Sequence, residues 1–123
     1  MDKLDEIFAL QKAYEDDMFA RRPKPPFTRE EWVSKLTIAI VGELAELNDE
    51  VNYKWWKNPK PIDEDAVKEE LVDVFHFFLS MCLKLGITSQ ELYAVYRKKN
   101  SENVARQQGR SAKPGYDTTV RDE

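Results

Sequence analysis

One segment of the sequence, from about Val67 to Leu85, carries apolar residues around nearly the whole circumference of a helix. Its main apolar face, at helical spacing, consists of Val67, Leu71, Val74, Phe75, Phe78 and Cys82. From Val74 onward the other faces are apolar as well, so this helix should be central and covered by other elements. Three further helices of so short a chain would not cover it. We therefore expect a second copy of the chain to complete the core.

Three other segments show helical periodicity, and each is bounded by residues that begin or end helices. The four predicted helices run over residues 2–21, 28–53, 63–85 and 88–106. Prolines at 23, 25 and 26 end the first, and Gly86 ends the third. The residues expected to cap the later helices are Thr28 with Glu31, Asp63, and Thr88 with Glu91. No segment alternates like a strand, which predicts an all-α fold, a four-helix bundle completed by dimerisation.

Length and composition narrow the class of protein. The 123 residues suit one domain, which we place at 1–108, with a flexible or partner-docked tail at 109–123. The net charge of −4 argues against binding to nucleic acid, and the lone Cys82 is expected to be a buried small hydrophobe. The N-terminus is too acidic for a signal peptide, and the longest apolar stretch is too short to span a membrane. We expect a cytoplasmic protein without a membrane partner.

Acidic residues stand beside the apolar stripes of the two middle helices. Glu43, Glu46 and Glu50 share one face of the second helix, although like charges three and four residues apart repel one another. Glu70 and Asp73 share one side of the central third helix. A buried carboxylate needs a partner, because burying an unpaired charge is costly. A hard cation such as Mg²⁺, which takes carboxylate oxygens as ligands, would be that partner.

The alternative interpretation is that these acids are ordinary surface residues in a chain with 23 Asp and Glu residues. Two such pairs on consecutive helices favour the metal site, formed by Glu43, Glu46, Glu70 and Asp73. His76, the one histidine, lies outside the acidic face by helical angle. We expect it to be a hydrogen-bonded structural residue rather than a metal ligand.

The arrangement of these acids resembles a known family. Glu43-x-x-Glu46 followed by Glu70-x-x-Asp73 is similar to the EXXE…EXXD signature of the all-α NTP pyrophosphohydrolases, a superfamily that includes dimeric dUTPases, MazG-type enzymes and dCTP pyrophosphatases. The segments 42–58, 69–87 and 96–109 resemble the dimeric dUTPase branch most closely. The resemblance covers nearly the whole chain, from about Leu4 to Gly109.

The resemblance implies an enzyme that converts dUTP to dUMP and pyrophosphate. It implies that the four acids bind Mg²⁺, with Mn²⁺ as a possible substitute, and that Glu43 or Glu46 helps to activate the attacking water. It also places Asp73 near the sugar and Phe77 against the base. A C-terminal pattern that contacts phosphates and sugar is matched by Lys99, Asn100, Asn103 and Arg106.

One departure from the family pattern lies on the first helix. Leu10 and Gln11 match residues of the dUTPases, in which the amides help to read uracil, but Tyr14 and Glu15 stand where leucine and asparagine are expected. The departure weakens the assignment of uracil more than that of the chemistry.

Residues after the second helix add candidates for substrate binding. Lys54 and Lys57 are placed to meet the outer phosphates, since lysine binds phosphate as a point charge. One of the adjacent tryptophans, taken as Trp56, is expected to wall the base pocket, because aromatic faces stack on bases.

Two other functions remain open at this point. One is a broader house-cleaning NTP pyrophosphatase of the MazG or dCTPase type, and the other is a non-catalytic helical dimerisation module. The expected assembly is a homodimer or a dimer of dimers.

Overall fold

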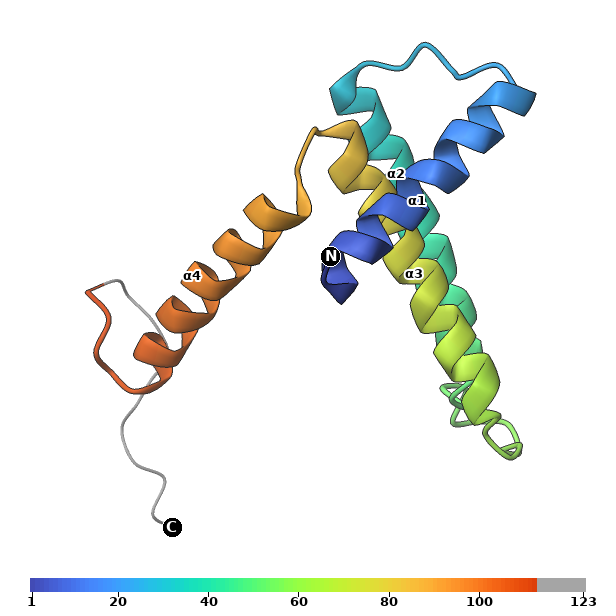
Figure 1. The fold of residues 1–123 in the computed structure, drawn as a ribbon. Coiled ribbons are helices and arrows are strands. Elements are labelled where there is room, and N and C mark those ends of the chain that lie inside the picture. The colour runs from blue at the N-terminus through green and yellow to red at the C-terminus, as the bar shows by residue number, and fades with distance from the viewer. Residues whose placement is uncertain (113–123) are drawn as a thin grey trace. The chain divides into compact units, whose positions relative to one another are not determined.

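The computed structural model describes residues 1–112, and every regular element in that range is an α-helix (Figure 1). The helices are α1 (Lys3–Arg21), α2 (Arg29–Asp49), α3 (Glu64–Lys84) and α4 (Ser89–Gln107). The predicted all-α class and its four helices are confirmed. The chain divides into a first unit, Met1–Thr88, and a second unit, Ser89–Glu123. Of the tail predicted at 109–123, residues 113–123 lie outside the described part.

Short polar side chains begin the first three helices. Asp2 Oδ1 accepts a hydrogen bond from the Asp5 amide at 2.9 Å at the start of α1. Thr28 and Glu31 form the predicted capping box of α2, in which each side chain accepts from the other residue's backbone amide at 3.1 Å. Asp63 caps α3 as predicted, by accepting from two amides of its first turn. These local bonds set where each helix starts.

The end of α2 differs from the prediction, which extended the helix to Tyr53. The helix ends at Asp49 because Asn52 adopts a left-handed backbone conformation, with φ of 55°. The Asn52 side chain also bonds to both backbone groups of Lys60, as acceptor at 2.9 Å and as donor at 2.7 Å. This pair of bonds closes a loop over residues 52–60 and takes the chain out of the helix.

Gly86 ends α3 as predicted. Its φ of 72° lies in the left-handed region, where a residue with Cβ is strained. The Gly86 amide bonds to the Leu83 carbonyl at 3.1 Å, and the Ile87 amide bonds to the Cys82 carbonyl at 2.9 Å. This is a Schellman motif, which satisfies carbonyls at the end of the helix. Arg29 at the start of α2 donates to the nearby Leu85 carbonyl at 2.9 Å, so α2 and α3 are tied together at this end.

In the first unit, α2 and α3 lie side by side and α1 crosses α3 (Figure 1). Their contacts bury a small core of Phe8, Leu36, Leu79 and Cys82. Cys82 is a buried free cysteine as predicted, and burial raises the pKa of its thiol. This packing brings the acidic faces of α2 and α3 together.

Large apolar side chains of α2 and α3 remain exposed. Ile38 and Val41 on α2 are 68% and 55% exposed, and Leu71 and Val72 on α3 are 52% and 51% exposed. The rings of Phe75 and Phe78 stack on each other at 6.2 Å, and each residue is 38% exposed. A single soluble chain rarely exposes so much apolar surface. The second copy expected from the sequence stays a prediction that fits this surface.

The second unit contains α4, which ends in another Schellman motif at Gly109, with φ of 69°. Arg106 pairs with Glu102 at 3.2 Å along the helix. Within the described residues, no helix taken alone is long and apolar enough to cross a membrane.

Candidate active site

Three carboxylates from the two adjacent helices converge at one point. One oxygen each of Glu43 and Glu46 on α2 and Glu70 on α3 lie within 4.8 Å of one another. Glu46 is exposed, whereas Glu43 and Glu70 are half-buried. The steps of three residues on each helix put the acids on the facing sides, as the sequence predicted. The three side chains are close enough to bind one cation together.

Two of these carboxylates have an oxygen that nothing in the described residues satisfies. Oε2 of Glu43 and Oε2 of Glu70 are shielded from solvent and have no hydrogen-bond partner there. Desolvation is the main reason why the pKa of Glu70 is raised, and the charges of Glu46, Asp73 and Glu43 raise it further. A buried acceptor without a partner is costly, so this cluster lacks a positive group.

The pKa of Glu43 is raised in the same way. Desolvation comes first, and the negative charges of Glu46 and Asp73 add to it. The charge of Asp73 thus raises the pKa of both Glu43 and Glu70. The oxygens of Asp73 themselves lie outside the close cluster of three. The four acids predicted from the sequence form one electrostatic site.

A pocket of about 530 Å³ opens beside the acids. It is lined by Tyr14, Glu43, Asp73, His76 and Phe77. The pocket therefore brings Asp73 and Phe77, predicted to contact sugar and base, to the same place as the acid Glu43. The sequence did not mark Tyr14 for substrate binding, although it follows Gln11 by one helical turn and is a departure from the family pattern. His76 falls in the same sequence run as Asp73 and Phe77 and was expected to be a hydrogen-bonded structural residue.

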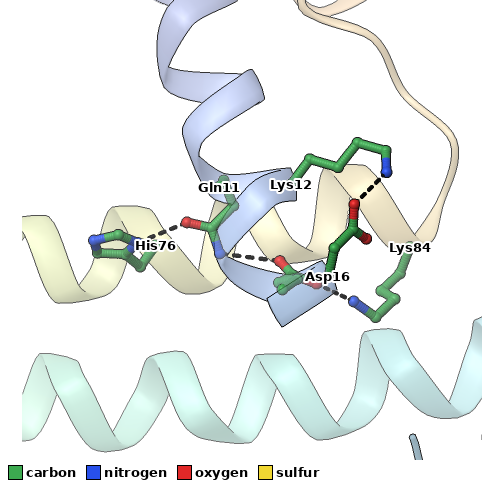
Figure 2. Close-up of polar contacts among 6 residues, drawn as sticks. Gln11, Lys12, Asp16, His76 and Lys84 are labelled. Atoms are coloured by element: carbon green, nitrogen blue, oxygen red, sulfur yellow. Dashed lines mark hydrogen bonds and ion pairs between the residues drawn. The ribbon is translucent and has the colours of Figure 1, made fainter. Parts of the chain in front are cut away.

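Behind His76, a chain of polar contacts runs from the pocket into the interior (Figure 2). His76 Nδ1 lies 2.6 Å from Gln11 Oε1, and Gln11 Nε2 donates to Glu15 Oε2 at 2.9 Å. Lys84 Nζ completes the chain by pairing with Glu15 Oε1. Gln11 is only 5% exposed and does not line the pocket, so the amide predicted to read uracil is engaged with its two neighbours.

A second, basic pocket lies at the loop after α2. Its volume is about 280 Å³, and its lining includes Lys54, Lys57 and Lys60. The two lysines expected to meet phosphates thus border one cavity. Trp56 lies in the same loop, is 59% exposed and packs edge-on against Trp55, with ring centroids 5.5 Å apart. Trp56 is not among the residues that line the pocket at Glu43.

The remaining predicted residues lie on α4, in the second unit. Lys99, Asn103 and Arg106 share one face of this helix by their spacing, and Asn100 is adjacent. Lys99 borders a pocket of about 340 Å³ together with Lys98. Their roles in binding phosphates and sugar stay predictions.

Comparison with known proteins identifies the family. A family model described as dUTPase matches residues 3–87, more than half of the chain. A dCTP pyrophosphatase of Enterobacteria phage LZ5 is 40% identical over 58 residues, which cover 47% of this chain and 34% of the relative. A dCTP pyrophosphatase of Enterobacteria phage T4 is 33% identical over 84 residues, which cover 57% of this chain and 49% of the relative.

A DNA replication protein of phage T4 is 32% identical over 77 residues, which cover 51% of this chain and 20% of the relative. The chain spans half or less of the length of each of these relatives. No solved structure matches it significantly. The family match includes both acidic pairs and the whole of α1, α2 and α3. The chain therefore belongs to the dimeric dUTPase-like family of all-α nucleoside triphosphate pyrophosphohydrolases.

Proposed function

We propose that this protein is a Mg²⁺-dependent pyrophosphohydrolase of pyrimidine deoxynucleoside triphosphates, with dUTP or dCTP as substrate. The products are the nucleoside monophosphate and pyrophosphate. The observation that carries the proposal is the convergence of Glu43, Glu46 and Glu70, with two shielded oxygens that have no partner among the described residues. An all-oxygen donor set on two rigid helices fits Mg²⁺, which Mn²⁺ can replace.

The residues that would hold the metal are Glu43, Glu46, Glu70 and Asp73. When bound, Mg²⁺ neutralises charge on the triphosphate and makes a bound water more acidic. Glu43 borders the substrate pocket, where its carboxylate can accept a proton from a water molecule. Glu43 accepts a proton from the attacking water, whose oxygen bonds to phosphorus while the P–O bond between the α and β phosphates breaks.

Other residues of the pocket suit a nucleoside. The rings of Tyr14 and Phe77 provide apolar walls for a base, and the Asp73 carboxylate can accept a hydrogen bond from a sugar hydroxyl. Lys54 and Lys57, which share the basic pocket, are suited to the outer phosphates. Together these groups cover the three parts of a nucleotide.

The comparisons support two different bases, uracil and cytosine. The family description points to dUTP, whereas two relatives carry the name dCTP pyrophosphatase. Gln11, the residue expected to read uracil, is bonded to Glu15 and His76 behind the pocket wall. Both substrates therefore stay in the proposal.

The test is release of pyrophosphate from a panel of dUTP, dCTP, dTTP, dATP and dGTP, with Mg²⁺ or with EDTA. We expect turnover of a pyrimidine nucleotide that requires the metal. Glu43→Gln keeps the size of the side chain but removes the base, and should lower kcat by about 10²–10⁴-fold. Glu69→Gln is the matched control, because Glu69 is exposed and outside the cluster. A folded protein that hydrolyses none of the five nucleotides would contradict the proposal.

A further inference from the structure

In the chain of polar contacts behind the pocket, the chemistry of the side chains determines which group donates and which accepts each hydrogen bond. It begins at Lys84, whose ammonium group can only donate hydrogen bonds. Its partner Glu15, paired with this cation, is an ionised carboxylate and can only accept. The two side chains are 8% and 7% exposed, so water does not compete for these positions. Both carboxylate oxygens of Glu15 are therefore hydrogen-bond acceptors.

The orientation of the Gln11 amide follows from this. Because Glu15 Oε2 accepts, the group of Gln11 that faces it must be the NH₂. The carbonyl oxygen of Gln11 is then the atom that faces His76 Nδ1. A carbonyl oxygen only accepts, so Nδ1 of His76 must carry the proton. In a neutral imidazole, the other nitrogen, Nε2, is then an acceptor.

The acceptor belongs to a ring that borders the nucleotide pocket. His76 lines this pocket together with Phe77 and Tyr14, and its ring lies 6.5 Å from that of Tyr14. In Figure 2 the second nitrogen of His76 points away from Gln11. The protein therefore fixes an acceptor at the pocket wall through a chain of hydrogen bonds that begins at Lys84, on the far side of α1. We call this chain, from Lys84 through Glu15 and Gln11 to His76, the relay.

We propose that His76 Nε2 accepts a hydrogen bond from an exocyclic amino group of the base, so that the pocket selects cytosine over uracil. Cytosine carries an amino group where uracil carries a carbonyl oxygen. Uracil would place that oxygen against the lone pair of Nε2 and leave both acceptors unsatisfied. Gln11, Glu15 and Lys84 are positioning residues that act through His76. This inference rests on the proposed function, because it deepens the choice between dCTP and dUTP.

The tautomer itself can be observed without any nucleotide. His76 is the one histidine of the chain, so an imidazole ¹H–¹⁵N correlation spectrum has a single set of ring signals. At about pH 8, where a free imidazole is neutral, we expect a protonated Nδ1 and an unprotonated Nε2. The opposite tautomer, with the proton on Nε2, would overturn the proposal.

Base selection is measured by binding rather than turnover, so that it does not depend on catalysis. The probes are α,β-imido analogues of dCTP and dUTP, titrated into the full chain with Mg²⁺. We expect the cytosine analogue to bind about tenfold or more tightly and to shift the Nε2 signal. Equal binding, tighter binding of the uracil analogue, or no binding of either would overturn the proposal. Selective binding without hydrolysis of dCTP would overturn only the proposed function.

Two variants separate the relay from simple structural support. His76→Asn supplies both a donor and an acceptor, and should bring the affinities for the two analogues close together. In Glu15→Gln the new amide must turn its oxygen to Lys84 and its NH₂ to Gln11. This reverses the Gln11 amide and should move the His76 proton from Nδ1 to Nε2 in the ¹⁵N spectrum. Asp16→Asn is the control, because Asp16 is adjacent but belongs to an exposed pair with Lys12. A folded Glu15→Gln protein that keeps the proton on Nδ1 and full selectivity would contradict the relay.

Discussion

Lys84 of α3 and Glu15 of α1 form an ion pair that is almost completely removed from solvent, with side chains 8% and 7% exposed. The Lys84 ammonium group also lies over two aromatic rings, 4.8 Å from the centroid of Trp32 and 5.2 Å from that of Phe19. Cation–π contacts of this kind offset part of the cost of desolvating the charge. The pair therefore joins α1 to α3 at the point where the two helices cross.

Removal of one partner of this pair should destabilise the protein strongly. Lys84→Met keeps the length of the side chain but leaves the Glu15 carboxylate buried without its cation. We expect the free energy of unfolding to fall by about 3–5 kcal/mol. Lys12→Met breaks the exposed pair with Asp16 on the same helix as Glu15, and should cost at most about 1 kcal/mol. Urea denaturation followed by circular dichroism measures both.

The double variant Glu15→Met/Lys84→Met distinguishes a charge effect from a loss of packing. Because it removes both charges, it should recover most of the stability that the single variant loses. If the double variant is as unstable as Lys84→Met, then contacts of the lysine stem, rather than the buried charge of Glu15, hold the helices together.

Metal binding should reverse the effect of the acidic cluster on stability. Without a divalent ion, the charges of Glu43, Glu46 and Glu70 repel one another, so Glu70→Gln should raise Tm in EDTA. In Mg²⁺ the wild type should have the higher Tm, because only the wild type binds the ion tightly enough to gain stability from it. Differential scanning calorimetry in EDTA and in Mg²⁺ tests this pair of shifts.

Glu69→Gln is again the matched control, since this acid is next to Glu70 but outside the cluster. Its Tm should follow that of the wild type in both buffers. A wild-type Tm that does not respond to Mg²⁺ would argue against a metal site at these carboxylates.

The parts of the structure that the sequence predicts well depend on neighbours along the chain. The capping box at Thr28, the cap at Asp63 and the glycine at 86 each act within a few residues. The convergence of Glu43, Glu46 and Glu70 was also predictable, because helical spacing puts the acids of each helix on one face beside an apolar stripe.

The relay behind the pocket was not predictable, since its contacts join residues far apart in the sequence. Gln11 meets His76 across 65 positions, and Glu15 meets Lys84 across 69. The sequence shows Glu15 only as a departure from the family pattern and Lys84 only as a charge at the end of an apolar run. Likewise, the early end of α2 depends on bonds between Asn52 and Lys60, which periodicity does not contain.

The exposed apolar face of α2 and α3 predicts association of two chains. Val41 is 55% exposed on α2, and Phe75 and Phe78 stack on the surface of α3. If a second copy covers this face, Val41→Lys should weaken the dimer by about tenfold or more, because a charge would be buried in its interface. Sedimentation equilibrium measures the change, with Ser34→Lys, an exposed polar position on the same helix, as the control. A wild type that is monomeric at micromolar concentration would contradict the prediction.

The raised pKa values of Glu43 and Glu70 predict how stability of the metal-free protein depends on pH. In the folded protein both carboxyl groups have a pKa above the ordinary value of 4.5. Their contribution to stability is therefore fully present below about pH 4.5. It is lost as the pH rises through the higher folded-state values. The variant Glu43→Gln/Glu70→Gln resembles the protonated state at every pH. In EDTA, the two proteins should therefore have similar Tm values near pH 4, and the wild type should fall below the variant by about pH 8. A difference in Tm that stays constant over this range would mean that neither carboxyl titrates differently in the folded protein.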